Sequence, residues 1–303
     1  MLFTPLKPMI VSIGKGAFDD DRFIFEPKYD GWRILIHKQG ERVEAYTRYG
    51  NLVTGKFPEL REMAAAIKAD AAILDCEGIC LRGGRPVFDD FSYRGRLGKS
   101  TSIAQAAVTH PATFVVFDVL YSGGQEHMGE PLMQRKERLA DIVVDSQVLT
   151  KTMVIDGAGQ ALFALTNEKD MEGIVAKRKD SKYCLDRTSP DWLKIKHFKT
   201  IDVIILGYRT EPFALAIGLH FRTIKYKPVG TVEFGFRPED KQAFLAVAQQ
   251  LRTDKDQKTQ WIEPRLCCRI EYLERTDTHQ LRTTIFRGFL PDKRPEDCVW
   301  PYL

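Results

Sequence analysis

Two apolar runs separated by a lysine and a turn signal constrain the fold of this chain more than any other segment. The runs are Phe23-Ile24-Phe25 and Ile34-Leu35-Ile36, and between them lies Glu26-Pro27-Lys28-Tyr29-Asp30-Gly31-Trp32-Arg33. The proline cannot donate a backbone hydrogen bond to a sheet, so it belongs at a strand end, and the Asp-Gly pair favours a tight turn. The segment predicts a strand ending at the lysine, a turn, and a return strand. Such a lysine is either a solvated residue of a surface hairpin or a nucleophile whose surroundings keep its amine neutral.

The composition is that of an ordinary globular protein. The chain has 303 residues, of which 44% are apolar and 28% charged, and this length favours two domains. No apolar run approaches the roughly 18 residues needed to span a bilayer. The start, Met1-Leu2-Phe3-Thr4-Pro5-Leu6-Lys7, lacks the apolar core of a signal peptide. We therefore expect a cytoplasmic protein with no membrane partner.

The spacing of the cysteines disfavours a zinc site, and the net charge excludes no class of partner. None of the six cysteines forms a Cys-x-x-Cys pair, and the six histidines are scattered, so buried reduced thiols are the simplest interpretation. The net charge of +4 permits nucleic-acid binding only if the basic residues share a face.

The first two-thirds of the chain combines strand and helix patterns. Strands are predicted at 22–28, 32–38, 42–48, 71–81, 114–120 and 173–177, and helices at 57–68, 131–143 and 158–169. Residues 92–102 predict a basic flexible loop. Its Gly98-Lys99-Ser100 resembles the end of a Walker A loop, but the glycine required at position 93 is tyrosine, which argues against a P-loop NTPase. We interpret Arg94, Arg96 and Lys99 as solvated residues available to phosphates.

The last third has a different pattern, with several short strands and one helix. Strands are predicted at 201–207, 214–221, 223–227, 231–236, 266–273 and 283–287, and a helix at 238–251. This arrangement in about 100 residues predicts a small β-barrel of the OB type. We place the boundary near His197–Thr200, which gives an α+β chain with domains at 1–197 and 198–303.

Further short segments carry charged or aromatic residues next to predicted strands. They are Thr47-Arg48-Tyr49-Gly50-Asn51, Asp75-Cys76-Glu77-Gly78, the strand Phe114 to Tyr121 with Phe117 at its centre, Glu172-Gly173-Ile174-Val175-Ala176-Lys177 and Trp192-Leu193-Lys194-Ile195-Lys196. Each has an ordinary structural interpretation: a core aromatic, a Glu-Gly turn, or lysines on the solvated face of a strand.

Together with the Lys28 segment, this series resembles the nucleotidyltransferase motifs of ATP-dependent DNA ligases. The resemblance extends from about Phe25 to Lys293 and is closest to the compact bacterial, phage and end-joining ligase modules. It includes Arg269-Ile270-Glu271-Tyr272, Thr276, Leu281-Arg282 and Phe286-Arg287-Gly288-Phe289. It implies an ATP-grasp-like nucleotidyltransferase domain followed by an OB domain. It also implies three steps: a lysine takes AMP from ATP, the AMP passes to the 5′-phosphate of a nick, and the 3′-hydroxyl displaces it.

The resemblance assigns the reacting groups. Lys28 is the expected nucleophile, and Lys194 and Lys196 are expected to neutralise the α-phosphate. A free lysine is almost wholly protonated at neutral pH, and either burial or these cations together with a metal would depress the pKa of Lys28. Glu77, Glu172 and Asp30 are the expected ligands of Mg²⁺ or Mn²⁺.

The nucleotide contacts are carried over in the same way. Phe117 is expected to stack on adenine, with the backbone around Glu26 reading the adenine edge and Lys177 close to the nucleotide. Glu77 is also expected near the ribose. Arg33 and Arg48 are expected to contact the ribose or the 5′-phosphate.

One segment departs from the family pattern. The last motif is usually Arg-x-Asp-Lys, where it orients the pyrophosphate of ATP, but here it is Leu290-Pro291-Asp292-Lys293. The expected arginine is leucine. We hypothesise that Lys293, together with Arg287 or Arg294, supplies the missing charge; the competing outcome is weak self-adenylation.

The expected partner is nicked double-stranded DNA, bound mainly through phosphates by a monomer, with end-joining or replication proteins as further partners. An RNA ligase or a capping guanylyltransferase is the nearest alternative, because both share the lysine motif. A non-catalytic nick-binding module is a more distant one. The lack of a zinc-finger cysteine set disfavours the NAD-dependent ligases.

Overall fold

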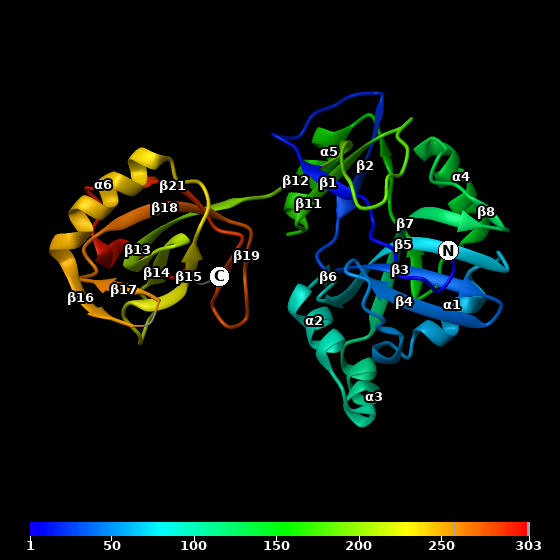
Figure 1. Ribbon diagram of the computed structural model, residues 1–303, viewed down its shortest axis with the longest axis horizontal. Coiled ribbons are helices and arrows are strands. Elements are labelled where there is room, and N and C mark those ends of the chain that lie inside the picture. The colour runs from blue at the N-terminus through cyan, green and yellow to red at the C-terminus, as the bar shows by residue number, and fades with distance from the viewer. Residues whose placement is uncertain (257, 302–303) are drawn as a thin grey trace. The chain divides into compact units, whose positions relative to one another are not determined.

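The computed structural model describes residues 1–256 and 258–301 and divides into two compact units, Met1–His197 and Phe198–Leu303 (Figure 1). In the described part of the chain, no helix is long and apolar enough to cross a membrane.

Unit 1 contains two sheets. The first is seven-stranded, with order β4-β3-β5-β7-β8 and with β6 on β5 and β9 on β7; the second is five-stranded, with order β1-β12-β11-β2-β10. The bounds in the first sheet are β3 (Trp32–Gln39), β4 (Arg42–Thr47), β5 (Ala71–Arg82), β6 (Arg85–Pro86), β7 (Ala112–Ser122), β8 (Gln125–Glu126) and β9 (Leu149–Lys151). Those in the second are β1 (Ile10–Ile13), β2 (Phe23–Lys28), β10 (Ile155–Asp156), β11 (Gly173–Arg178) and β12 (Thr188–Lys196).

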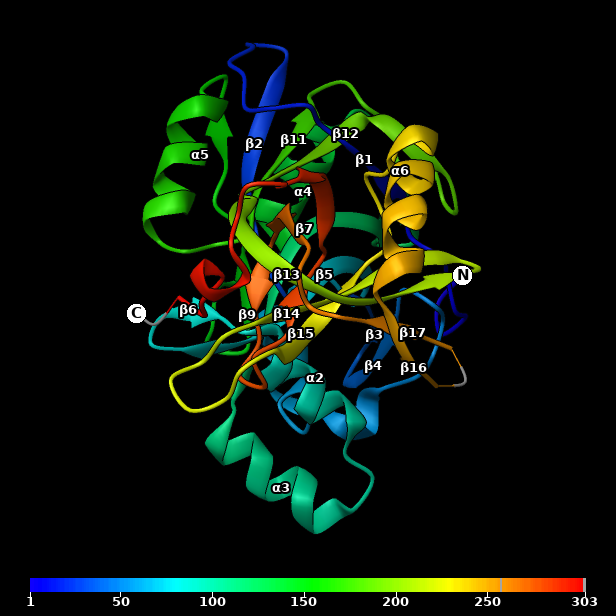
Figure 2. The same ribbon diagram turned by 90° about the vertical axis from the view of Figure 1, so that its left-hand side faces the viewer.

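Helices pack against both sheets. They are η1 (Thr54–Lys56), α1 (Leu60–Ala66), α2 (Phe88–Arg96), α3 (Ser100–Thr109), α4 (Leu132–Ile142) and α5 (Gly159–Glu168). In both views α5 lies beside β2 and β11 (Figures 1 and 2). A buried cluster that includes Ile24, Leu35 and Trp192 joins the inner faces of the two sheets.

The strands around the lysine segment do not form the hairpin that the sequence predicts. β2 pairs with β10 and β11, whereas β3 pairs with β4 and β5, so the connection after Lys28 crosses from one sheet to the other. Gly31 makes this crossing possible, because a Cβ there would lie 2.1 Å from the backbone oxygen of Gly78 on β5. The two strand predictions are confirmed, but the connection has a bend at Gly31 instead of a tight turn, and the predicted pairing is wrong.

The prediction of a flexible loop at 92–102 is also wrong. The segment contains the end of α2, a short break and the start of α3. Arg94 is fully buried: its guanidinium pairs with Glu59 at 2.7 Å and donates to the backbone oxygen of His110 at 2.6 Å. Arg96 and Lys99 are exposed, as expected for solvated residues.

Unit 2 is built on a seven-stranded sheet around the long strand β13, which pairs with β14, β17 and β18 along its length. The strands are β13 (Lys199–Thr210), β14 (Phe213–Leu219), β15 (Lys227–Val232), β16 (Arg252–Lys255), β17 (Gln260–Ile262), β18 (Cys267–Tyr272) and β21 (Ile285–Phe289). A two-stranded sheet of β19 (Glu274–Arg275) and β20 (Leu281–Arg282) and the helices α6 (Pro238–Ala248), η2 (Gln249–Leu251) and η3 (Pro295–Asp297) complete the unit.

The predicted strands at 223–227 and 231–236 are replaced by the single strand β15. The residues before it turn back, and Tyr226 has a left-handed backbone with φ of 54°. The other strand and helix predictions agree with the structure to within a few residues. The short strands β1, β6, β8, β9, β10, β16, β17, β19 and β20 and the helices α2 and α3 were not predicted.

Candidate active site

Three neighbouring strands place a row of polar side chains on one face of the five-stranded sheet. β11 lies between β2 and β12, and its Gly173 is directly opposite both Lys28 and Lys196. Since side chains alternate along a strand, the residues that share this face are Glu26, Lys28, Lys177, Trp192, Lys194 and Lys196. The alternate residues, including Phe25, Ile174 and Ile195, form an apolar cluster on the other face.

Glu172, which directly precedes β11, joins the two ends of this row. Its carboxylate forms ion pairs with Lys28 and with Lys196, the latter at 2.7 Å, and the Glu172 side chain is only 5% exposed. Gly173 has a φ of +144°, and a Cβ there would lie 2.1 Å from the backbone oxygen of Ile195. Only glycine therefore allows β11 to approach β12 beside Glu172.

Burial and three neighbouring carboxylates act in opposite directions on the pKa of Lys28. Burial by itself would lower the pKa of Lys28, but the carboxylates of Glu172, Glu77 and Asp30 outweigh burial and raise it above its usual value. The depression expected from the neighbouring cations together with a metal stays a prediction. The pKa of Lys194 is lowered, by burial and by the nearby charges of Lys196 and Lys28.

The Glu77 side chain also lies near Lys28, although it belongs to the other sheet. It lies on β5 opposite Arg33 of β3, and burial raises its pKa to about 8, against the opposing effect of Lys28 and Arg33. Asp30, in the connection between the sheets, adds to this electrostatic cluster. Within the described ranges, no group of three His, Cys, Asp or Glu side chains is close enough to form a metal site from protein ligands alone.

The two arginines predicted to contact the nucleotide or the nick are in different environments. Arg33 donates from Nε to Asp75 at 2.9 Å, from Nη2 to Asp75 at 2.6 Å and from Nη1 to the backbone oxygen of Met9 at 2.6 Å. The Tyr183 hydroxyl also donates to Asp75 at 2.6 Å. Arg33 is therefore held by protein groups, whereas Arg48 is exposed, with its guanidinium 4.6 Å from the ring of Tyr49.

A second cluster surrounds Phe117 on β7. The ammonium of Lys177 is 4.3 Å from the centre of the Phe117 ring and 3.9 Å from that of Trp192. Its Nζ is 2.7 Å from the Glu26 carboxylate, but the contact is poorly aligned, and among the described residues this Nζ has no directional hydrogen bond. Burial lowers the pKa of Lys177 to about 8, Glu26 opposes the shift, and Lys136 adds to it.

The sequence did not single out Lys136 as a site residue. This lysine of α4 donates to the backbone oxygen of Phe117 at 2.8 Å and pairs with the Glu26 carboxylate. It thus fixes β2 to β7 behind the Phe117 ring. The only signal is its position in a helix, next to the buried Arg135, which binds Asp118 at 2.8 Å; no local pattern indicates which strand it reaches.

The segment that departs from the family pattern lies in unit 2. Leu290 packs against the apolar core of that unit, and Lys293 forms an ion pair with Asp202 at 3.3 Å. Arg287 pairs with Glu271, and Arg294 pairs with Asp297 at 3.2 Å. The hypothesis that Arg287 or Arg294 supplies the missing charge stays a prediction.

Comparison with known proteins identifies the family. The family model described as "ATP dependent DNA ligase domain" matches residues 7–196, more than half of the chain. The SPbeta prophage-derived DNA ligase-like protein LigB of Bacillus subtilis is 30% identical over 94% of this chain and 98% of its own length. The multifunctional non-homologous end joining DNA repair protein LigD of Mycobacterium tuberculosis is 28% identical over 98% of this chain, which spans only 40% of that relative.

Solved structures agree with this assignment. A mycobacterial DNA ligase D complexed with ATP and MES has a TM-score of 0.58 at 29% identity, covering 97% of this chain and 98% of the other. A structure of a Lig E DNA ligase has a TM-score of 0.62 at 13% identity, covering 93% and 99%, and bears on the fold alone. These matches favour a DNA ligase over an RNA ligase or a capping enzyme: the chain belongs to the family of ATP-dependent DNA ligases.

Proposed function

We propose that this chain seals nicks between a 3′-hydroxyl and a 5′-phosphate in duplex DNA, using ATP and a covalent AMP adduct of Lys28. The observation that carries the proposal is the row of Lys28, Glu172 and Lys196, which is assembled from three strands beside Glu77. The primary amine of Lys28 has two cations, Lys194 and Lys196, and two carboxylates, Glu77 and Glu172, around it. This set of charges suits the transfer of a phosphoryl group better than a structural role.

In the first step, the neutral amine of Lys28 attacks the α-phosphate of ATP and diphosphate leaves. Glu172 holds the proton on Lys28 until the nucleotide is bound, so the amine becomes nucleophilic only when that ion pair is weakened. Lys194 and Lys196 neutralise the negative charge on the α-phosphate. In the later steps the same cations face the 5′-phosphate of the nick.

The carboxylates fit a divalent metal. Glu77 and Glu172 are hard-oxygen donors close to one another, and burial raises the pKa of Glu77 to about 8, so a bound cation would stabilise its charged form. Mg²⁺ characteristically takes one or two carboxylates together with substrate phosphates. With Asp30 nearby, these residues would hold Mg²⁺ or Mn²⁺, which supplies positive charge to the phosphate oxygens.

The cluster at Phe117 is the proposed adenine site. The ring offers a stacking face, and the buried Lys177 ammonium keeps unused donor capacity beside it. The backbone at Glu26 reads the adenine edge, while Lys136 keeps that strand in place. Since Arg33 is held by Asp75, we assign the phosphate contact at the nick to Arg48 and a positioning role to Arg33.

Unit 2 is proposed to be an OB-fold domain. Its support is the sheet centred on β13, with α6 packed on it through Phe244. We propose contacts mainly to DNA phosphates, which would make binding strongly salt-dependent. The likeness to LigD favours a role in DNA end joining and repair over replication, in a cytoplasmic protein that acts as a monomer.

A gel assay tests the sealing reaction. A labelled duplex with one nick should be joined in the presence of ATP and Mg²⁺ only when the nick carries a 5′-phosphate, and Lys28→Ala should abolish joining. Efficient sealing of a nicked RNA duplex but not of DNA would overturn the assignment of substrate.

A further inference from the structure

Two cysteines of unit 2, separated by 31 positions in the chain, are in direct contact. The Cys298 thiol donates to the Cys267 sulfur at a distance of 3.7 Å. Both side chains belong to the apolar core of the unit, and the residues are only 1% and 2% exposed. A sulfur–sulfur bond is about 2.05 Å long, so a small movement of the side chains would bring the two sulfurs to bonding distance. The candidate active site uses neither thiol.

The backbone holds Cys267 in place. This residue begins β18 and pairs with Ile204 of the long strand β13. Its backbone oxygen accepts a hydrogen bond from the backbone N–H of Leu290 at 2.9 Å. Since side chains alternate along a strand, that of the next residue, Cys268, points to the other face of β18. Cys267 is therefore the cysteine of this strand that faces Cys298.

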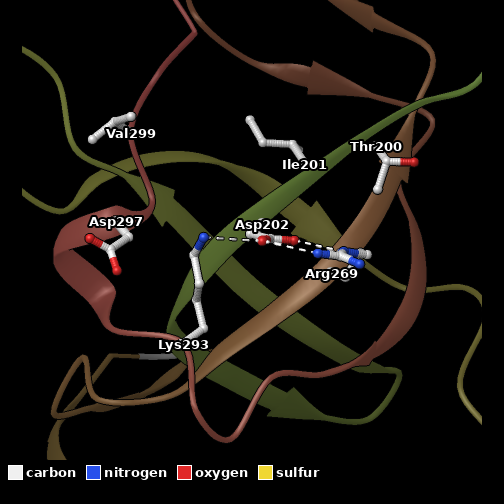
Figure 3. Close-up of a pocket in the computed structure, with 7 residues that line it drawn as sticks. All are labelled: Thr200, Ile201, Asp202, Arg269, Lys293, Asp297 and Val299. Carbon is white, nitrogen blue, oxygen red and sulfur yellow. Dashed lines mark hydrogen bonds and ion pairs between the residues drawn. The ribbon is translucent and has the colours of Figure 1, made fainter.

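Cys298 points inward from a segment that otherwise lies at the surface. Residues 291–297 are all exposed or half-buried, and Val299 is 55% exposed. Asp297 and Val299, the two neighbours of Cys298 in the chain, line a hollow on the surface of unit 2 (Figure 3). The backbone oxygen of Cys298 accepts from the N–H of His220 at 2.8 Å. Because the segment is one layer thick, a local opening would expose both thiols to a small molecule from solvent.

The contact makes the two thiols chemically different. The hydrogen bond from Cys298 lowers the pKa of Cys267, and the nearby Lys293 ammonium lowers it further, although burial opposes the shift. The same hydrogen bond and burial raise the pKa of Cys298. A thiolate, not a thiol, attacks an oxidant, so Cys267 is the sulfur that reacts first and Cys298 is the sulfur placed to react with the product.

We propose that Cys267 and Cys298 form an oxidative modification site, at which hydrogen peroxide converts the two thiols to an intrachain disulfide. The Cys267 thiolate first attacks one peroxide oxygen, and the O–O bond breaks. The hydroxide that leaves takes up the proton released by Cys267, so the products are a sulfenic acid and water. The Cys298 sulfur then attacks the Cys267 sulfur, the S–O bond breaks, and the hydroxyl leaves with the Cys298 proton as a second water. The two sulfurs together lose two electrons, which reduce the peroxide, and a dithiol reductant reverses the change.

The disulfide would fasten a surface segment to β18. Leu290 is already bonded to the backbone of Cys267, and the new bond would attach Cys298 to the same residue. The segment between Leu290 and Cys298 would then be held at both ends, and the local opening that admits the oxidant would be suppressed. Both effects concern unit 2 alone, so they do not depend on the proposed function.

Peptide mapping of the whole protein after treatment with hydrogen peroxide tests the site directly. Remaining thiols are blocked by alkylation under denaturing conditions, and the peptide that contains Cys267 should then be joined to the peptide that contains Cys298. A dithiol reductant should separate them. Cys267→Ala and Cys298→Ala should each lose the link, whereas Cys268→Ala, the matched control at the neighbouring buried cysteine, should keep it. The absence of the linked peptide in the wild type, or a link that persists in Cys267→Ala, would overturn the proposal.

Amide hydrogen exchange then tests whether the bond fastens the segment. In the whole wild-type protein, residues 291–297 should exchange more slowly after treatment with peroxide than before it, because their local opening is suppressed. The reductant should restore the faster exchange. Peroxide should leave the exchange of these residues unchanged in Cys298→Ala. Exchange that is equally fast or faster in the oxidised wild-type protein would show that the bond does not fasten the segment to β18, and would overturn this part of the proposal.

Discussion

Lys28 and Glu172 form an ion pair although 144 residues separate them in the chain. The pair exists because β11 lies next to β2 and begins directly after Glu172. The proposed nucleophile is therefore held in its protonated, unreactive form by a residue that the proposed reaction also uses.

Replacing Glu172 should separate its ion pairing with Lys28 from its part in the proposed reaction. In Glu172→Gln the pKa of Lys28 falls because its nearest carboxylate is gone, so Lys28 should react faster with an amine-acylating reagent in the absence of nucleotide. AMP transfer from ATP should nevertheless fall about 100-fold or more, as for removal of a charge-stabilising group. Peptide mapping of the acylated site and label transfer measure the two effects, with the exposed Glu168→Gln as control. A fall in both rates would show that Glu172 does not restrain Lys28.

Gly173 should tolerate no side chain. Gly173→Ala puts a Cβ 2.1 Å from the Ile195 oxygen at a backbone conformation that alanine rarely adopts. We expect a loss of unfolding free energy of about 2 kcal/mol or more, within the range for such backbone strain. Gly16→Ala, where a Cβ meets nothing within 4 Å, is the control for urea unfolding. Equal stability of the two variants would contradict the close approach of β11 and β12.

Arg33 and Arg48 should differ sharply in what they stabilise. Arg33→Ala leaves the fully buried Asp75 carboxylate without its cation and should cost about 3–5 kcal/mol of unfolding free energy. Arg48→Ala removes an exposed side chain, so stability should change by less than about 0.5 kcal/mol, while the affinity for nicked DNA falls. Thermal or urea unfolding and a binding titration on each variant measure the two effects. If Arg33→Ala instead lowered the affinity for nicked DNA and Arg48→Ala lowered the stability, Arg33 would be the arginine that contacts the phosphate at the nick.

Lys177 should make stability depend on alkaline pH. Its native pKa of about 8 lies below its ordinary 10.5, so between these values the unfolded chain binds more protons than the native one. The unfolding free energy of the wild type, relative to Lys177→Met, should therefore rise with pH in this window, by roughly 3 kcal/mol in total, and stay flat below pH 8. Urea unfolding at pH 7, 8, 9 and 10 tests this; a difference that falls with pH would mean that Lys177 is not buried beside the rings.

Local patterns predicted most strands and helices, but not how they pair. The alternation in Phe23 to Lys28 and in Trp192 to Lys196 indicates strands with one polar face, and that face is where Lys28, Lys194 and Lys196 meet. Nothing within these segments indicates that β2 and β3 belong to different sheets, because their partner strands β11 and β5 lie far along the chain.

Burial of charged residues was the least predictable feature. Arg94 stands in a run of polar and basic residues typical of a loop, yet its partner Glu59 is 35 positions away. Lys136 contacts Glu26 across 110 positions. Such pairs are determined by tertiary packing, so a sequence shows that the charges exist but not which of them neutralise each other.

The most direct test of the whole account is the mass of the intact protein after incubation with ATP and Mg²⁺. We predict an increase equal to one AMP group, located on Lys28 by peptide mapping and absent in Lys28→Ala. An unchanged mass in the wild-type protein, or an AMP group on another residue, would contradict the central claim that Lys28 is the nucleophile.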